Sequence, residues 1–222
     1  TPFQPRFQSN EKGDIQIIGN ALLKCPAGNC GGNNNSYSMV NIDIDNDAAT
    51  FNSSSANFTL PAGATVLWAG LYWNGISTNS ARNTALFRTP VSGGYISLTG
   101  ITYDNSYGYQ GFKDVTSLVQ AGGSGTYMTA NVRSNTGTNT WAGWALVVVY
   151  RDPSKPQRNL TVFDGLANVS TSNANVNITI SGFTTPLFGP VNVALGVVAY
   201  DGDADLTGDA LKFNNQLISN GL

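Results

Sequence analysis

Short runs of β-branched and aromatic residues, separated by clusters of Gly, Asn, Ser and Pro, recur along the whole chain. Helical periodicity is almost absent, and this combination is typical of a β-sandwich or barrel. Residues 65–73 and 142–150 are almost continuously apolar, which predicts central strands covered on both faces. Residues 174–180 alternate strictly, which predicts a strand with one solvated face. The expected strands are residues 14–18, 39–43, 56–60, 65–73, 84–88, 95–98, 125–132, 142–151, 160–164, 174–180, 191–200 and 210–213.

The pattern therefore predicts an all-β fold, an antiparallel, jelly-roll-like β-sandwich of about a dozen strands with one short connecting helix. The helix is expected within residues 112–120, where Asp114 can cap its start and residues 122–123, both Gly, can end it. No linker or low-complexity segment interrupts the rhythm, so residues 1–222 are expected to form a single domain. Residues 210–217 resemble the start of a hairpin without its return strand, which predicts that a longer chain continues beyond Leu222.

The composition favours an extracellular protein. Charged residues make up only 11% of the chain, and Gly, Ser, Thr and Asn take the surface positions that Lys and Glu usually fill. With a net charge of -2 and no basic run, nucleic acid is not an expected partner. The longest apolar run is strand-sized, far below the roughly 18 residues that span a bilayer, so no direct membrane insertion is expected. The chain begins at Thr1 without an apolar leader, as in a secreted product whose signal peptide has been removed.

Cys25 and Cys30 enclose a short turn-forming segment, which favours a local disulfide over two free thiols. A metal pair is disfavoured because it would need more thiolates or a histidine, and the chain has no histidine. A disulfide here would point to an oxidising, extracellular compartment.

The absence of histidine also excludes Ser-His-Asp and Cys-His catalysis, and no phosphate loop or dinucleotide fingerprint is present. A carboxylate pair for glycoside hydrolysis remains as an alternative, although Glu11 is the only glutamate. We therefore expect a protein that is not an enzyme.

Two groups of aspartates at alternate positions stand out, and they are the candidate metal ligands. Carboxylates spaced in this way can converge in a turn on a hard cation such as calcium. The alternative is that they are solvated turns, since Asp is a preferred turn residue. The first group is Asp43, Asp45 and Asp47, and the second is Asp201, Asp203, Asp205 and Asp209.

Aromatic residues fall into two sets. Tyr103, Tyr107 and Tyr109 occur in a polar segment without apolar period, which predicts exposed tyrosines that contact a ligand. The tryptophans lie in or beside the strongest strands, so core packing is expected, with a sugar-stacking platform as the alternative. They are Trp68, Trp73, Trp141 and Trp144.

Several segments, taken in order, resemble the N-terminal region of the SprB-type gliding-motility adhesins of Bacteroidota and related large surface proteins exported by the type IX secretion system. These segments are residues 13–20, 41–56, 69–73, 112–116, 130–133, 142–150, 163–165 and 202–209. The resemblance implies a secreted module at the start of a long surface protein, without catalytic residues.

From these observations we expect a non-catalytic extracellular module of a bacterial cell-surface adhesin, involved in surface attachment or gliding motility, with loops stabilised by calcium. Its expected partners are surface glycans or other cell-surface or filament proteins. One alternative is a structural subunit of an extracellular filament, and another is a carbohydrate-binding or carbohydrate-active domain.

Overall fold

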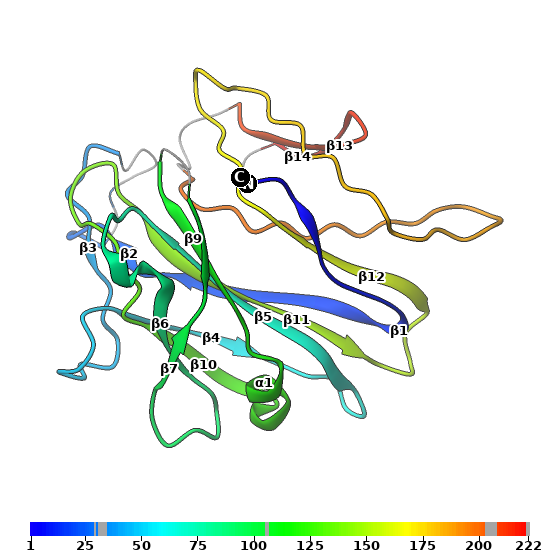
Figure 1. Ribbon diagram of the computed structural model, residues 1–222, viewed down its shortest axis with the longest axis horizontal. Helices are drawn as coiled ribbons and strands as arrows, with labels where there is room; N and C mark the ends of the chain where they lie inside the picture. The colour runs from blue at the N-terminus through cyan, green and yellow to red at the C-terminus, as the bar shows by residue number, and fades with distance from the viewer. Residues whose placement is uncertain (29, 31–34, 105–106, 203–207, 221–222) are drawn as a thin grey trace.

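The computed structural model describes residues 1–28, 30, 35–104, 107–202 and 208–220 (Figure 1). Its secondary structure is almost entirely β, and every ladder between the described strands is antiparallel, which confirms the predicted fold class. No described helix is long and apolar enough to cross a membrane. The elements are β1 (Gln4–Ala21), β2 (Leu23–Lys24), β3 (Val40–Asn41), β4 (Ser53–Phe58), β5 (Thr65–Gly75), η1 (Ser80–Asn83), β6 (Thr84–Arg88), β7 (Ile96–Thr99), β8 (Ile101–Asp104), β9 (Tyr109–Asp114), α1 (Thr116–Gly122), β10 (Gly125–Ala130), β11 (Ala142–Arg151), β12 (Gln157–Asp164), β13 (Ala210–Phe213) and β14 (Gln216–Asn220).

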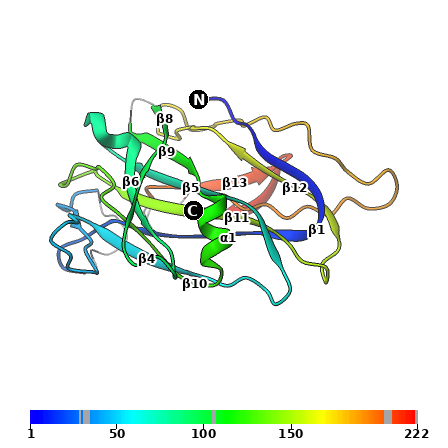
Figure 2. The same cartoon turned by 60° about the horizontal axis from the view of Figure 1, so that its bottom comes forward.

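Two sheets pack face to face as a sandwich (Figure 2). One sheet has the strand order β12-β1-β11-β5-β9-β8, and the other has the order β4-β10-β6-β7. The main core lies between them, where Trp73 and Leu146 of the larger sheet meet the side chains of the smaller one. Tyr127 of β10 anchors that smaller layer, with Phe87 stacked on it at 5.7 Å and Phe58 edge-on at 6.1 Å between ring centroids. The sandwich is therefore closed by large aromatic side chains, which bury much apolar area per residue.

The predicted central strands, β5 and β11, pair with each other in the middle of the larger sheet. Their second face is also covered, because the first half of β1 and its partner β12 form a ribbon that folds back over it (Figure 1). Phe7 of this ribbon stacks on Trp68 at 5.7 Å, and Trp68 in turn stacks on Phe112 at 6.3 Å. Coverage on both faces explains why these strands are continuously apolar.

A charged pair, of which the carboxylate is buried and the guanidinium partly exposed, holds the ribbon to the sheet. Arg6 Nε donates to Asp164 Oδ2 at 2.7 Å, and the guanidinium also donates to Tyr103 Oη at 2.6 Å. The same guanidinium lies 4.5 Å from the ring centroid of Phe112. Tyr72 Oη donates to Asp164 at 3.4 Å, and burial together with the nearby carboxylate raises the pKa of Tyr72 far above its usual range. These contacts connect the ribbon with β5, β8 and β9.

The predicted strands at residues 174–180 and 191–200 are wrong. Between β12 and β13 the described chain forms only one isolated bridge, between Ser170 and Asn173, and most of it is exposed. Figure 1 shows this stretch as a long arm, in yellow and orange, that projects from the sandwich. Strand-type residues form a ladder only where a neighbouring backbone is available, and the arm touches the ribbon at single points, such as Gln8 Nε2 to the Gly182 carbonyl at 2.7 Å.

The structure also differs from the sequence prediction in the return strand after β13, in β8 and β9, and in where the helix starts. The expected lack of a return strand after β13 is wrong, because β14 pairs with it across Asn214 and Asn215, which have φ of 47° and 65°. Strands β8 and β9 were not predicted, since their sequence is polar and rich in Tyr and Gly. The helix is confirmed as α1, although it starts later than expected, at Thr116, and Gly123 with φ of 60° ends it.

Candidate functional site

A polar cleft of about 520 Å³ opens where the loops after β3, β5 and β10 meet. Its walls are formed by Asn41, Phe51, residues 77–79 and residues 133–136. These loops gather at the end of the sandwich that carries β2 and β3 in Figure 1. Every described lining residue except Phe51 is polar, and none carries a carboxylate. The cleft therefore offers hydrogen-bonding groups and no general acid of its own.

Two asparagines fix the wall that contains Phe51. The Asn52 amide, fully buried, donates to the Val132 carbonyl at 2.9 Å and accepts from the Val132 N–H at 3.1 Å. Asn131 accepts from the Phe51 N–H at 2.9 Å and donates to the Ala49 carbonyl at 3.0 Å. Asn131 has φ of 55°, a left-handed conformation that Asn adopts more readily than most residues. The side chains thus replace a strand ladder at a place where the backbone has left the sheet.

The opposite wall, residues 133–136, is tied to the ends of β5 and β9. Tyr109 Oη donates to the Arg133 carbonyl at 2.8 Å from within the core. Ser134 Oγ accepts from the Ile76 N–H at 3.2 Å, and the Asn135 N–H donates to the Ile76 carbonyl at 2.7 Å. The cleft is therefore built on backbone that the sandwich holds in place, which reduces the entropy that a ligand would have to remove on binding.

The Arg133 guanidinium lies over the Phe51 ring, 4.6 Å from its centroid. It forms no ion pair with any carboxylate in the described part of the chain. Asn41 lines the same cleft, and its Oδ1 is buried without a donor in the described structure. Among the described lining residues, Arg133 therefore supplies the positive charge of the cleft.

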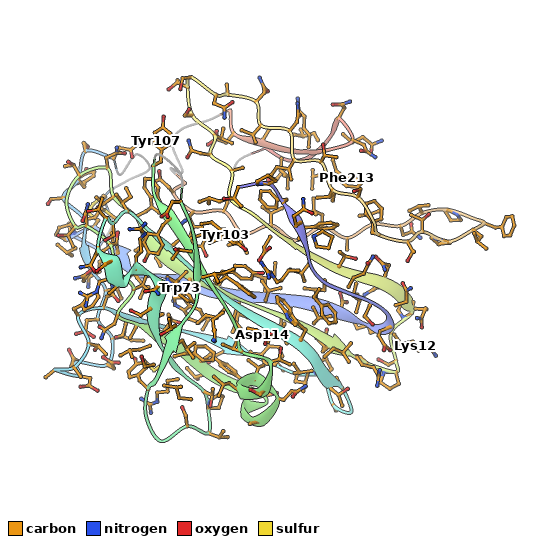
Figure 3. All side chains as sticks on the ribbon, in the orientation of Figure 1. Lys12, Trp73, Tyr103, Tyr107, Asp114 and Phe213 are labelled. Carbon is orange, nitrogen blue, oxygen red and sulfur yellow. A yellow bond between two sulfur atoms is a disulfide. The ribbon has the colours of Figure 1, made fainter. Side chains whose placement is uncertain are left out.

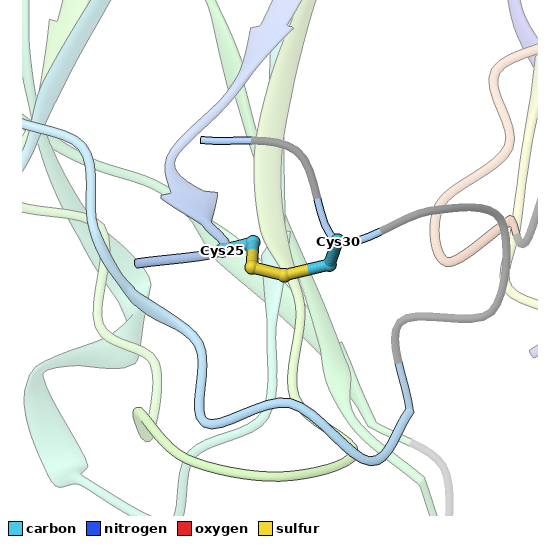
Figure 4. The surroundings of a disulfide bond; sticks show 2 residues. All are labelled: Cys25 and Cys30. Atoms are coloured by element: carbon cyan, nitrogen blue, oxygen red, sulfur yellow. A yellow bond between two sulfur atoms is a disulfide. The ribbon is translucent and has the colours of Figure 1, made fainter. Parts of the chain in front are cut away.

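Cys25 and Cys30 form the predicted disulfide, with their Cα atoms 5.9 Å apart (Figure 4). Both cysteines pack against the main core, next to Leu23 and Met39. The bridge closes a loop of few residues, so loop-closure arithmetic gives it a contribution of about 2 kcal/mol or less. It holds this loop against the same end of the sandwich as the cleft.

In the first aspartate group, Asp45 is satisfied by protein donors. Its carboxylate accepts from the Tyr95 hydroxyl in a short hydrogen bond, from Thr50 Oγ1 at 3.0 Å and from the Asp47 N–H at 3.2 Å. Partial burial by itself would raise the pKa of Asp45, but these hydrogen bonds, led by the one from Tyr95, outweigh it and lower the pKa to about 2. Asp45 thus stabilises the turn as an ionised acceptor.

The two neighbours of Asp45 also accept hydrogen bonds within the loop. Asp43 Oδ1 accepts from Ser53 Oγ at 2.9 Å, and Asp47 Oδ1 accepts from the Ala49 N–H at 2.9 Å. Among the described residues, no group of three or more His, Cys, Asp or Glu side chains is placed to hold a metal ion. The first group therefore has the geometry of an aspartate-stabilised turn.

The second aspartate group is described only at its edges. Asp203 and Asp205 lie outside the described residues. Asp201 has φ of 66°, and Asp209 is exposed immediately before β13.

The three candidate tyrosines lie in different environments, and Figure 3 labels two of them, Tyr103 and Tyr107. Tyr107 is 47% exposed, which agrees with the predicted exposure, and its contact with a ligand stays a prediction. Tyr103 is half-buried in β8, where its hydroxyl accepts from Arg6. Tyr109 is fully buried, so the prediction of an exposed residue is wrong for it. The reason is that Tyr109 begins a strand and its ring points into the core, where its hydroxyl donates to the backbone carbonyl of Arg133.

Three of the four tryptophans confirm the expectation of core packing. Trp68, Trp73 and Trp144 are buried, and Trp144 Nε1 donates to Ser54 Oγ at 2.8 Å across the sandwich. Trp141 is half-buried beside the cleft loops and takes no part in the cleft lining.

Comparison with known proteins gives one match. Residues 29–220 match the family described as Protein of unknown function (DUF3344). The chain belongs to the DUF3344 family. No curated protein and no solved structure matches it. The DUF3344 segment includes every cleft residue and both aspartate groups, and it begins after β1 and β2.

Within the DUF3344 segment, Arg133 and Phe51 are the site residues that sequence reasoning missed. They are far apart in the chain, and only the fold brings the guanidinium onto the ring. One signal was available, because Arg133 is the only charged residue between Asp114 and Arg151. An isolated charge in a polar loop marks a candidate binding residue more clearly than a tyrosine in an irregular segment.

Proposed function

We propose that this domain is a non-catalytic recognition module of a secreted bacterial cell-surface adhesin, which serves attachment or gliding motility. The observation that carries the proposal is the polar cleft on loops that buried hydrogen bonds attach to a rigid sandwich. Binding sites are commonly placed on such loops, since the scaffold keeps their geometry while their sequence varies.

The chemistry of the cleft supports recognition. Hydroxyl and amide side chains supply donors and acceptors for a polar ligand, and the described lining holds no carboxylate that would act as a general acid. The resemblance of several segments, in the same order along the chain, to SprB-type adhesins supports the same hypothesis.

A secreted location is supported by two independent features. The Cys25–Cys30 disulfide is of a kind that persists in oxidising compartments. The chain is rich in Gly, Ser, Thr and Asn, and only 11% of its residues are charged.

We also propose that calcium stiffens the aspartate-rich loops, with the second aspartate group, residues 201–209, as the main site.

The test is binding of the purified chain to surface polysaccharides and to whole bacterial cells, measured by pull-down and calorimetry. Asn135→Trp fills the cleft from an exposed position and should weaken binding at least tenfold. Thr138→Trp, in the same loop and outside the lining, is the matched control and should bind like the parent chain. If both variants bind equally well, or the parent binds no surface at all, the proposal fails.

A second candidate function, a structural filament subunit, is favoured by the arm at residues 165–200. This stretch has no Asp, Glu, Lys or Arg, and it exposes large apolar side chains, with Leu187 at 91% and Phe188 at 90%. Charges normally protect strand-type segments from association with other chains, and none protects this one.

The hypothesis of a filament subunit predicts that the chain associates with itself, which sedimentation at increasing protein concentration measures. Replacing Leu187 and Phe188 by Asp should yield monomers, whereas Val91→Asp, at an exposed apolar residue of the sandwich, should leave association unchanged. A parent chain that stays monomeric at all concentrations excludes this second candidate.

A further inference from the structure

The cationic group of the cleft, Arg133, has no counter-ion among the residues that the structure describes. Arg133 is half-buried, rests on Phe51 and makes no ion pair within the described residues. The other described arginines differ, because each of Arg6, Arg82, Arg151 and Arg158 pairs with a carboxylate, and Arg88 is exposed on β6. A half-buried guanidinium without an anion is poised to accept one from a ligand.

The geometry of the pair defines how the anion would approach. The guanidinium carbon of Arg133 lies over the Phe51 ring, 4.6 Å from its centroid, and a guanidinium packed on a ring in this way can still donate hydrogen bonds through its N–H groups. This planar fork matches a carboxylate, which it can bind through two parallel hydrogen bonds. No described lining residue carries a negative charge that would compete for it.

The remaining lining residues point to the rest of the ligand. Ser77, Thr78, Asn135 and Thr136 offer neutral hydroxyl and amide groups. These groups suit hydroxyls better than apolar side chains. The one aromatic ring is already occupied by Arg133, so the cleft lacks a free platform for stacking a neutral sugar.

We propose that the cleft binds an acidic saccharide, with Arg133 paired to the carboxylate of a uronic acid and the neutral residues bonded to its hydroxyls. This inference rests on the proposed function of the cleft as the recognition site. The cleft volume of about 520 Å³ is within the range usual for small-ligand sites.

The test compares an oligogalacturonate with the oligogalactoside of the same length, titrated calorimetrically into the full chain. We expect at least a tenfold preference for the acidic oligomer, and a loss of that preference as salt concentration rises. Arg133→Gln should lower the affinity for the acidic oligomer at least thirtyfold and remove its preference over the neutral one. Arg88→Gln removes an exposed charge outside the cleft and should change both affinities less than twofold.

Equal binding of the two oligomers, or an Arg133→Gln variant that melts like the parent and retains its affinity, would overturn the inference. Binding of neutral saccharides that Asn135→Trp abolishes would also overturn it, while the recognition function would stand. If neither oligomer binds, the inference fails, and retention on whole cells then decides the proposed function separately.

Discussion

Asparagine side chains act as backbone substitutes at the cleft. Asn131 and Asn52 together bridge residues 49–52 and Val132 with hydrogen bonds that a regular ladder would otherwise supply. A hydrogen bond in this setting contributes about 1 kcal/mol, and its loss leaves a buried backbone group without a partner. The shape of the cleft therefore depends on residue identity at two positions.

Substitution of Asn131 separates its two roles. Asn131→Gly keeps the positive φ but loses both side-chain hydrogen bonds, and we expect a loss of about 2 kcal/mol in the free energy of unfolding. Asn131→Ala adds the cost of a left-handed Cβ, for a total of about 3 kcal/mol. Urea denaturation measures both values. Asn139→Ala, also at φ of 55° but in an exposed position, should cost only the conformational part of about 1 kcal/mol. Equal losses for all three variants would refute the bridging role.

Asp45 predicts how stability changes in acid. Its pKa is about 2 in the folded chain against 3.8 ordinarily, so the unfolded chain takes up the proton first as the pH falls. The stabilisation is complete above pH 4 and is lost between pH 4 and pH 2, and we expect about 1 kcal/mol for this partly exposed group. Denaturation in chelator at these pH values should show the slope for the parent and a flatter profile for Asp45→Asn. Asp209→Asn should retain the parental slope, and a parental slope in Asp45→Asn would contradict the assignment.

At the scale of elements, the ribbon of β1 and β12 is the least expected feature. β1 pairs with β12 over its first half and with β11 over its second half, and the change of partner falls at Gly13. A Cβ at Gly13 would overlap the carbonyl oxygen of Tyr150, so the close approach of the two strands there needs glycine. The bend places the ribbon over the second core.

Gly13→Ala should therefore destabilise the fold by about 3 kcal/mol, because the backbones must separate where the ribbon turns. Thermal and urea unfolding give the value. Gly94→Ala, in an exposed turn where an added Cβ meets nothing within 4 Å, should change stability by less than about 0.5 kcal/mol. A mild effect at Gly13 would mean that the bend tolerates a wider separation of the strands.

The arm at residues 165–200 shows that the alternation of apolar and polar residues does not by itself predict a paired strand. Its alternation is that of a strand, and yet no ladder forms in the described structure, since a strand is stabilised by its neighbour and not by its own sequence. The sequence of β4 alternates less regularly and yet forms a ladder, because β10 lies beside it.

At the scale of the whole molecule, calcium is the factor that can couple loops to global stability. The described residues contain no ready metal site, and the best candidate ligands, Asp203 and Asp205, lie outside them. Our proposal of a calcium-stiffened second group is therefore tested by calorimetric melting in chelator and in millimolar calcium.

Calcium at about 100 times its dissociation constant should add about 2.7 kcal/mol to the free energy of unfolding. The double substitution of Asp203 and Asp205 by Asn should abolish the effect, whereas Asp43→Asn should leave most of it. An unchanged melting temperature would reduce both groups to ordinary aspartate turns.

The all-β class, the two central strands β5 and β11, the helix near Gly123, the disulfide and the burial of Trp68, Trp73 and Trp144 could be predicted from the sequence alone. These follow from local periodicity, turn residues and cysteine spacing, which act over a few neighbouring positions. Only the tertiary structure decided the folded-back ribbon, the unpaired arm, the burial of Tyr109 and the stacking of Arg133 on Phe51. Each of these depends on which distant segment lies alongside, and that choice is made by the packing of the whole chain.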